Sequence, residues 1–576
     1  MNHPRGKDSR FLHVSRAVFI GWIGLWLSWS LEAEVPATPS VAALEISGIF
    51  TDHMVLQRRM NVPVWGWARP GEEVTVIIDR QTKTTMTDDQ GKWRVKLDAM
   101  ETGAPRKMII RGEADSIEFN DILVGEVWIA SGQSNMDWPL SQARNGKQAI
   151  AAADLPEIRM FNLNRGGTPA SKNGPSERIL DGSRNSKKYK ETWQICTPVS
   201  AKDNFSAVAF FFARDLQAAL HVPIGIISNS VGGSAVEMWI SRDAFEADPD
   251  FKAATQFFDR LVEYGQTPAG QADVKANYDA YEAKQAEAKA QGKLPLWPPH
   301  AGGAPKKDVF TCRWFDSRIH PLIPFAMRGV IWYQGEAQTY VPGDRQGLYP
   351  RDYEAMFQLL IKDWRTRWGE GDFPFLFVQL PNWSGPAKSP ADVSSWTTIR
   401  QAQLKTLSVP NTAMAVTIDV GDAALMHPLD KEPVGARLAL AARATVYGEK
   451  LEYSGPIYRE MKIEGGAIRL FFDHIGGGLE ARGGELKQFA IAGKDRKWVW
   501  AKAVIDGDTV IVSSPDVPAP TMARYAVATN PSGCNLYNKQ GLPASPFMTY
   551  TSPPVERGAY YKWKLTEPLT LLPAKP

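Results

Sequence analysis

The sequence predicts an α/β protein in which a parallel sheet carries helices on both faces and is flanked by two β-rich modules. Between residues 122 and 450, short apolar strands alternate with amphipathic helical segments, a pattern typical of parallel sheets covered on both faces. Residues 46–121 and 451–550 consist mainly of short β-type runs separated by turn residues. A chain of 576 residues exceeds one typical domain, so modules beside a main domain are expected.

The amino-terminal segment has the composition of an export signal. Basic residues, the last of them Arg16, precede an apolar stretch at 17–31, and the small residue Ala33 follows it. A charged region, an apolar region and a small residue in this order predict a cleaved signal peptide over residues 1–33. The protein is therefore expected to be secreted or periplasmic. A retained membrane anchor is the alternative, although the apolar stretch is short for a membrane span.

The first β-rich module is expected over residues 46–121. Its apolar runs include 62–67, 74–78 and 108–110, and Pro70-Gly71 supplies a turn between two of them. Many short strands with turn signals between them predict a β-sandwich of the immunoglobulin-like type.

The main domain is expected over residues 122–450. The predicted strands are 127–131, 224–229, 330–334, 375–380 and 414–419; the predicted helices are 206–220, 353–368, 396–407 and one that contains Val434, Leu438 and Ala441. A helical insertion is expected near 264–305. Its segment 273–292 is rich in Ala, Lys, Glu and Gln and reads as a solvated pair of helices. A surface elaboration is favoured here over a lid on the substrate side.

The remaining sequence is a second β-rich module at 451–550 and a proline-punctuated tail at 551–576. The three cysteines, Cys196, Cys312 and Cys534, are widely separated and odd in number, so they predict neither a disulfide framework nor a metal site. No HExxH motif occurs, and we expect neither a metal nor another cofactor. A formal net charge of +3 without a basic stripe predicts no nucleic-acid partner. No stable membrane partner is expected once the signal is cleaved.

Polar clusters follow four of the predicted strands. They are Gln133-Ser134-Asn135, Gly232-Gly233-Ser234, Gln334-Gly335-Glu336, and the segment from Asp422 to His427. Because the carboxyl ends of parallel strands meet at one edge of a sheet, residues far apart in sequence converge there. A serine, backbone-exposing glycines, carboxylates and a histidine at one edge are the groups that acyl transfer requires.

The chemistry assigns roles to these residues. Ser134 needs a base to accept its proton when it attacks a carbonyl carbon, and His427 is the best candidate because imidazole titrates near neutral pH. The developing oxyanion needs fixed donors, which the backbone amides of Ser134 and Gly233 and a side-chain amide can supply. His320, which also precedes a proline, is the alternative base.

Four motifs together resemble the sialate O-acetylesterase family of SGNH hydrolases. They are Gly-Gln-Ser-Asn-Met at 132–136, Gly-Gly-Ser at 232–234 followed by Glu237 and Trp239, Gly-Val-Ile-Trp-Tyr-Gln-Gly-Glu at 329–336, and His427-Pro428. The similarity extends from about Ile46 to Phe547. It implies an SGNH-hydrolase-like, flavodoxin-like sheet and a metal-independent carbohydrate esterase that removes O-acetyl groups through a serine acyl-enzyme.

The resemblance also implies site residues. Ser134 matches the nucleophile, His427 the base and Gly233 an oxyanion donor, and the block from Gln334 to Glu336 matches a polar wall beside the oxyanion. The neighbours of Ser134 in its motif, Gln133 and Asn135, are expected at the oxyanion or substrate.

The chain departs from the family pattern at the acid that orients the histidine. Many SGNH hydrolases have Asp three positions before the histidine, and Ala424 stands there. Asp422 ranks first as its replacement, Glu336 second, and Asp419 is a third carboxylate at a strand end. A second departure is Ala337-Gln338 after Glu336, where relatives often have Ser-Asn, so Gln338 is the candidate to replace an asparagine donor.

Structural roles are favoured for the aromatic residues near the strand ends and for the other histidines. Trp138, Trp239 and Tyr333 are suited to stacking on a sugar ring, but packing is favoured for aromatic residues beside strand ends. His53, His221 and His474 lie outside the expected active edge and are read as structural.

The sequence thus predicts an esterase whose partner is an O-acetylated sugar or oligosaccharide. Acetylated xylan or pectin is the alternative substrate class. A carbohydrate-binding protein with an impaired hydrolase site is the alternative of another kind, and the missing acid before His427 is the feature that favours it.

Overall fold

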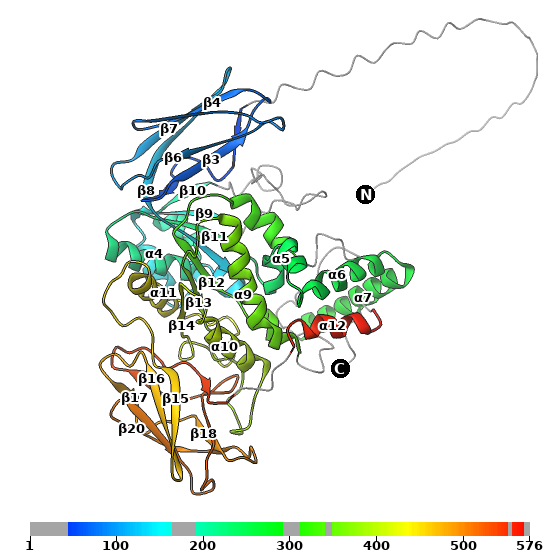
Figure 1. Cartoon of the computed structure of the whole chain (residues 1–576), viewed down its shortest axis with the longest axis vertical. Coiled ribbons are helices and arrows are strands. Elements are labelled where there is room, and N and C mark those ends of the chain that lie inside the picture. Colours follow the sequence, from blue (N-terminus) through cyan, green and yellow to red (C-terminus); the bar gives the residue numbers. More distant parts are fainter. Residues whose placement is uncertain (1–43, 164–191, 292–311, 340–347, 551–555, 570–576) are drawn as a thin grey trace, which may run out of the picture. The chain divides into compact units, whose positions relative to one another are not determined.

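The computed structural model describes residues 44–163, 192–291, 312–339, 348–550 and 556–569 (Figure 1). The predicted signal peptide at 1–33 lies outside the described residues. No helix within the described segments has the length and apolarity needed to cross a bilayer.

The chain begins with two antiparallel sheets. One has the strand order β1-β3-β6, and in the other β5, β4, β7 and the first part of β8 lie side by side. The strands before β8 are β1 (Glu45–Ile46), β2 (Val55–Gln57), β3 (Val62–Trp67), β4 (Glu73–Ile78), β5 (Gln81–Met86), β6 (Lys92–Leu97) and β7 (Arg106–Arg111). Buried and more exposed residues alternate along β4 and β6, as expected when one face of a sheet packs on a core.

Strand β8 (Ser116–Gly132) belongs to two sheets at once. Its first part pairs antiparallel with β7, and its second part pairs in parallel with β11 and β12. The predicted boundary between residues 121 and 122 therefore falls inside one strand of 17 residues. Asp121 sits at this point with φ of 55°, and its carboxylate is held by Arg159 and His53.

The central sheet has the order β10-β9-β11-β8-β12-β13-β14. Its members besides β8 are β9 (Leu155–Asn162), β10 (Trp193–Cys196), β11 (Ile224–Ser230), β12 (Gly329–Tyr333), β13 (Phe375–Val378) and β14 (Thr412–Ala415). All neighbours are parallel except β9 and β10. The five predicted strands stand in the order 2-1-3-4-5, the flavodoxin-like order. Strands β9 and β10, which sequence analysis missed, extend the β11 edge.

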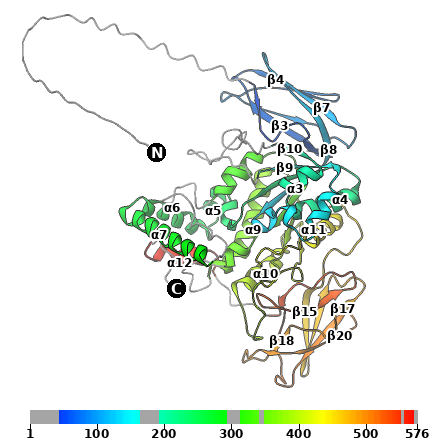
Figure 2. The same cartoon turned by 180° about the vertical axis from the view of Figure 1, so that it is seen from behind.

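Helices cover both faces of this sheet, so the predicted α/β class is confirmed (Figures 1 and 2). The main ones are α4 (Ala207–Leu220), α9 (Leu348–Trp368), α10 (Ser395–Thr406) and α11 (Glu432–Thr445). Trp128 of β8 packs against Phe212 of α4, whereas Trp332 of β12 packs against Phe357 of α9. Since Trp332 pairs with Ser131, three positions beyond Trp128, the two tryptophans point to opposite faces.

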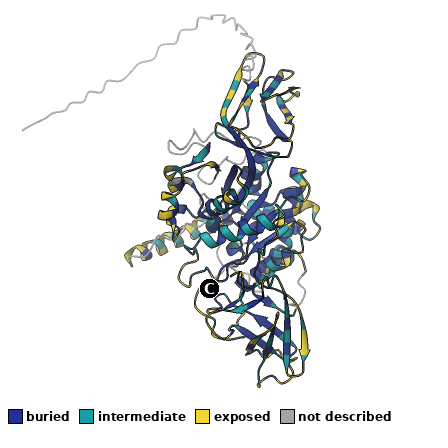
Figure 3. Ribbon diagram, turned by 90° about the vertical axis from the view of Figure 1, so that its left-hand side faces the viewer, coloured by how far each residue is buried: buried dark blue, intermediate teal, exposed yellow. Residues whose placement is uncertain are grey.

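The insertion after β11 differs from its prediction. Residues 273–291 do not form a helical pair but belong to α7 (Pro268–Ala290) and the residue after it, and the partner of α7 is α6 (Lys252–Gly265). Thr267 caps the start of α7, Pro268 and Gly270 lie in its first turn, and neither proline nor glycine follows from there to Gly292. Most of α7 is exposed, in contrast to the buried central strands (Figure 3). The short helices before and within the site region are α1 (Ser134–Asp137), α2 (Gly146–Ala151), α3 (Pro198–Asn204) and α5 (Arg242–Ala247).

Part of the predicted tail is a packed helix. Helix α12 (Ala559–Thr566) contacts α6 and α9. Tyr560 and Tyr561 are buried there, and Asp352 of α9 accepts hydrogen bonds from the backbone amides of Gly558 and Tyr560. Local composition around residue 551 carries no signal for this, because the helix is stabilised by contacts with distant segments.

The chain after α11 forms further antiparallel strands. The sheets are β15-β16-β21-β20, β19-β18-β22-β24 and the pair β17-β23. Their bounds are β15 (Ile457–Glu464), β16 (Ala467–Asp473), β17 (Leu479–Ala481), β18 (Phe489–Ala492), β19 (Val499–Trp500), β20 (Lys502–Asp506), β21 (Thr509–Ser513), β22 (Met522–Tyr525), β23 (Leu536–Asn538) and β24 (Phe547–Met548). These strands bury an apolar cluster of their own, centred on residues such as Leu470, Ile491 and Val510.

Candidate active site

The turn after β8 presents Ser134 at the carboxyl edge of the central sheet. Gly132 has φ of 133°, and a Cβ there would lie 2.2 Å from the carbonyl oxygen of Tyr333, so only glycine permits this approach of two backbones. The amide of Gln133 donates to the same carbonyl at 2.9 Å. Ser134 then begins α1 and is half-buried.

His427 faces Ser134. The distance between Ser134 Oγ and His427 Nε2 is 2.8 Å, which is hydrogen-bond distance for a nucleophile and its base. One face of the imidazole stacks on Trp138, with ring centroids 5.2 Å apart and the planes 17° from parallel. Burial, followed by the charge of Lys431, lowers the pKa of His427 below its ordinary value.

The carboxylates that the sequence suggested as partners of His427 are engaged elsewhere. Asp422 Oδ1 accepts hydrogen bonds from the amides of Ala424 and Leu425 at 2.7 and 3.1 Å, and Asp419 pairs with Arg437. The predicted contact between Asp422 and His427 is not formed, because Asp422 closes a turn of its own loop. Among the described residues, no carboxylate hydrogen-bonds to the His427 ring.

Glu336 contacts Asn135 rather than His427. Asn135 Nδ2 donates to Glu336 Oε1 at 2.5 Å and to the carbonyl oxygen of Met426 at 3.2 Å, while Asn135 Oδ1 accepts from Lys431 Nζ at 2.5 Å. Asn135, Glu336 and Lys431 are all buried. Asn135 was predicted to face the oxyanion or the substrate. Its side-chain amide instead links the carboxylate of Glu336 to the ammonium of Lys431.

Burial sets the pKa values of this pair. It raises the pKa of Glu336 and lowers that of Lys431 to about 7, and the charge of Glu336 opposes the shift of Lys431. The sequence pattern does not predict a role for Lys431, since a lysine next to the first residue of a helix carries no signal of burial.

The glutamine side chains brace the loops of the site. Gln334 Nε2 donates to the carbonyl oxygen of Ser234 at 3.1 Å and to Gln338 Oε1, and Tyr353 Oη donates to Gln334 Oε1 at 3.0 Å. Both amide hydrogens of Gln334 are thus used, and its side chain is buried. The expected place of Gln334 beside the oxyanion is therefore corrected: it holds the loop that contains Gly233.

Gln133 and Gln338 also have protein partners. Gln133 Oε1 accepts from the amides of Gly335 and Ala337, both at 3.3 Å. Gln338 Nε2 donates to Glu237 Oε2 at 3.0 Å, and Tyr349 Oη donates to the other oxygen of Glu237 at 2.6 Å. These contacts fix the loop after β12 to the loops that follow β8 and β11.

The loop after β11 places backbone amides beside Ser134. A Cβ on Gly232 would lie 3.5 Å from the Cβ of Ser134, and Gly233 has φ of 69° and open space at its Cβ position. Among the described residues, the amides of Ser134 and Gly233 donate to no protein acceptor. They are therefore available to a bound oxyanion.

The other predicted alternatives lie in different surroundings. His320 is in a helical turn before β12 and contacts Phe315 edge-on. His53 pairs with Asp121, and His474 pairs with Glu452. Trp239 and Tyr333 are fully buried, so the favoured packing role holds for them, whereas Trp138 lies on His427.

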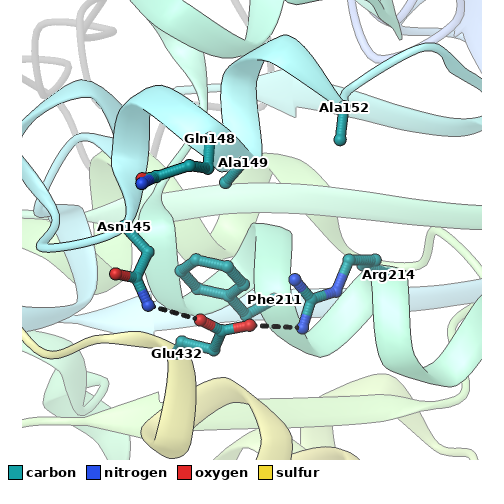
Figure 4. A pocket seen from close by; sticks show the side chains of 7 residues that line it. All are labelled: Asn145, Gln148, Ala149, Ala152, Phe211, Arg214 and Glu432. Carbon is teal, nitrogen blue, oxygen red and sulfur yellow. Dashed lines mark hydrogen bonds and ion pairs between the residues drawn. The ribbon is translucent and has the colours of Figure 1, made fainter.

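A separate pocket of ≈ 380 Å³ lies between α2, α4 and the start of α11. Glu432 accepts hydrogen bonds there from Asn145 Nδ2 and Arg214 Nη2, both at 2.9 Å (Figure 4). Its charged groups thus neutralise one another, and none of the predicted site residues lines it. Within the described part of the chain, no cluster of three His, Cys, Asp or Glu residues is arranged to hold a metal ion.

Known proteins resemble this chain over most of its length. A family model described as carbohydrate esterase, sialic acid-specific acetylesterase, matches residues 314–442. The sialate O-acetylesterase of Mus musculus is 29% identical over 546 residues, which cover 87% of this chain and 93% of that protein. The human protein of the same name is 27% identical over 541 residues, 86% of this chain and 91% of that protein.

A solved structure gives stronger similarity. A carbohydrate acetylesterase from Xanthomonas citri is 35% identical, with a TM-score of 0.71, and the match covers 88% of this chain and 100% of that one. Identity at this level over a whole relative confirms the resemblance found in the sequence motifs. The chain belongs to the family of carbohydrate esterases described as sialic acid-specific acetylesterases, and it is a carboxylic ester hydrolase.

Proposed function

We propose that the protein removes O-acetyl groups from sugars through an acyl-enzyme formed on Ser134. The observation that carries this proposal is the 2.8 Å contact between Ser134 Oγ and His427 Nε2. Beside it lie the amides of Ser134 and Gly233, which have no acceptor among the described residues. The strand order 2-1-3-4-5 of the central sheet supports the SGNH-type arrangement that the sequence motifs imply. Sialic acids are the first substrate class to test, because the similar vertebrate proteins are named sialate O-acetylesterases.

The first half of the reaction acylates the enzyme. Ser134 Oγ forms a bond to the acetyl carbon while its proton passes to His427 Nε2, and the carbonyl electron pair moves onto oxygen. The amides of Ser134 and Gly233 donate to this oxyanion. When the tetrahedral intermediate collapses, the bond to the sugar oxygen breaks and His427 returns its proton to that oxygen.

The second half repeats the same steps with water. Water gives a proton to His427 and attacks the acetyl carbon, the bond to Ser134 Oγ breaks, and the serine regains the proton. The products are the deacetylated sugar and acetate. The steps described here use Ser134, His427, two backbone amides and water.

The test of the proposed function is acetate release from a panel of O-acetylated sialic acid, acetylated xylan oligomers and acetylated pectin fragments. Release from sialic acid alone would support the namesake activity, and preferred release from xylan or pectin would assign a polysaccharide acetylesterase. A folded protein that releases acetate from none of them would contradict the proposal and favour the binding-protein alternative.

Asp422→Asn tests whether the site works without an orienting carboxylate. Asparagine retains the acceptor oxygen that Ala424 and Leu425 use, so we expect kcat/KM to remain within about threefold of the parent value. Steady-state kinetics on the best substrate of the panel measures this. A loss approaching the roughly 10⁴-fold effect of removing a triad aspartate would mean that Asp422 reaches His427 during catalysis.

The predicted secretion or periplasmic export rests on residues 1–33 alone and stays a prediction.

A further inference from the structure

Within the part of the chain that the structure describes, no carboxylate hydrogen-bonds to His427 to orient it. In a serine–histidine–aspartate triad the aspartate fixes the tautomer and orientation of the imidazole. Here the His427 ring hydrogen-bonds to Ser134 and stacks on Trp138. Something else must hold the ring toward Ser134, because a free imidazole would rotate among its rotamers.

Asn135 connects the nucleophile turn with the loop of the base. It directly follows Ser134, and its Nδ2 donates to the carbonyl oxygen of Met426, the residue before His427. A single buried side chain therefore ties the backbone beside the nucleophile to the backbone beside the base. This tie fixes the Cα of His427 relative to Ser134 but depends on the orientation of the Asn135 amide.

Lys431 sets that orientation. Its ammonium donates to Asn135 Oδ1 at 2.5 Å, so the amide nitrogen of Asn135 must point toward Met426 and Glu336. Lys431 Nζ also lies 5.8 Å from the centroid of the Trp138 ring, within the range of a cation–π contact. Lys431 thus contacts both groups that hold His427: the amide that ties its loop and the ring that stacks on its imidazole.

The position of Lys431 is itself fixed. Only 1% of its surface is exposed, and Lys431 immediately precedes Glu432, the first residue of α11. Arg214 and Asn145 hold Glu432 through the pair of hydrogen bonds in the pocket of Figure 4. Burying an ammonium destabilises the fold even when the charge is paired. Proteins in which apolar side chains of similar size replace a buried ion pair are often no less stable. Keeping this charge beside the site therefore points to a catalytic purpose.

We propose that Lys431 is a positioning residue of the esterase, which holds His427 toward Ser134 through Asn135 and Trp138 in place of an orienting carboxylate. This inference rests on the proposed roles of Ser134 and His427. Lys431 acts through these neighbours and touches neither the reacting ester nor the leaving group.

The decisive experiment removes the buried charge pair together. Lys431→Met alone would leave Glu336 buried without its counter-charge, whereas Lys431→Met with Glu336→Gln removes both charges and is expected to fold. We expect kcat of this double variant to fall about 10- to 100-fold, as for a misplaced base, with KM within about twofold of the parent value. The matched control is Lys405→Met with Glu354→Gln, which removes an exposed pair between α10 and α9 and should leave kcat unchanged.

A pH profile separates the effect of Lys431 on the pKa of His427 from its effect on the position of the imidazole. The charged and titratable groups near Lys431 include Glu336, whose charge acts on it, and Tyr333, whose ring centroid lies 5.4 Å from Lys431 Nζ. Asp430 and Asp137 adjoin Lys431 and Trp138 in sequence. Of these groups, Lys431 lowers the pKa of His427. Removing its charge raises that pKa, so the acidic limb of kcat/KM should move to higher pH in the double variant. Because loss of the charge moves the limb with or without repositioning, positioning is measured by kcat on the plateau above the limb, where His427 is neutral in both proteins.

Two outcomes would overturn the inference. One is a folded double variant whose kcat on the plateau is that of the parent. If the double variant does not fold, variants of Trp138 provide the test. Trp138→Leu should lower kcat, whereas Trp138→Phe should retain it. The other outcome that would overturn the proposal is a parental kcat in Trp138→Leu. Ser134→Ala in the same assays distinguishes failure of the proposed function from failure of the Lys431 proposal. Activity without Ser134 would refute the proposed function itself.

Discussion

Ser134→Ala should lower kcat/KM for acetate release by about 10⁴-fold or more. Alanine removes the oxygen that forms the acyl-enzyme, and no other hydroxyl contacts His427 among the described residues. The fold should be retained, because the Ser134 side chain is half-buried and, among the described residues, hydrogen-bonds to His427 alone. The measurement is steady-state acetate release, with circular dichroism to confirm folding.

Ser408→Ala is the control for this variant. Ser408 is an exposed serine after α10, and its replacement should leave activity and stability as in the parent. Hydrolysis by Ser134→Ala at a rate near that of the parent would remove Ser134 as the nucleophile, whatever the behaviour of the control.

His427→Gln should lower kcat/KM by roughly 10³-fold or more. Glutamine keeps a polar group of similar length but cannot accept and return the serine proton near neutral pH. Because Ser134 remains, a slow residual reaction is expected, and its rate should rise with hydroxide concentration. A parental rate in His427→Gln would direct attention to another base, with His320 the alternative that the sequence offers.

The pH dependence of the parent enzyme should show the titration of His427. The neutral imidazole is the base, so kcat/KM rises as pH increases through the pKa of His427. Burial and Lys431 lower that pKa, and the half-maximal rate should therefore lie below about pH 6.5, the ordinary value. His427→Gln should lack this limb. A limb well above pH 6.5 in the parent would mean that a carboxylate stabilises the imidazolium after all.

The sequence by itself determined the parts of this protein that depend on local pattern. Apolar runs such as 127–131 and 224–229 predicted central strands, and helical spacing predicted helices such as α4 and α11. These predictions succeed because the periodicity of apolar side chains depends only on residues that are close in sequence. The topology rule for parallel sheets then brought Ser134 and His427 to one edge although 293 positions separate them. The motifs around Ser134 and Glu336 led to the family that whole-chain similarity confirms.

Only the tertiary structure decided which polar groups face one another. Asp422, Gln334 and Asn135 are plausible site residues in sequence, yet Asp422 closes its own loop, Gln334 braces the loop of Gly233, and Asn135 lies between Glu336 and Lys431. The partner of a hydrogen-bonding group depends on which distant atoms meet it after folding, and several partners satisfy the same side chain equally well. For the same reason the burial of Lys431, and with it the means by which His427 is held, emerges only when the start of α11 packs against the turn after β8.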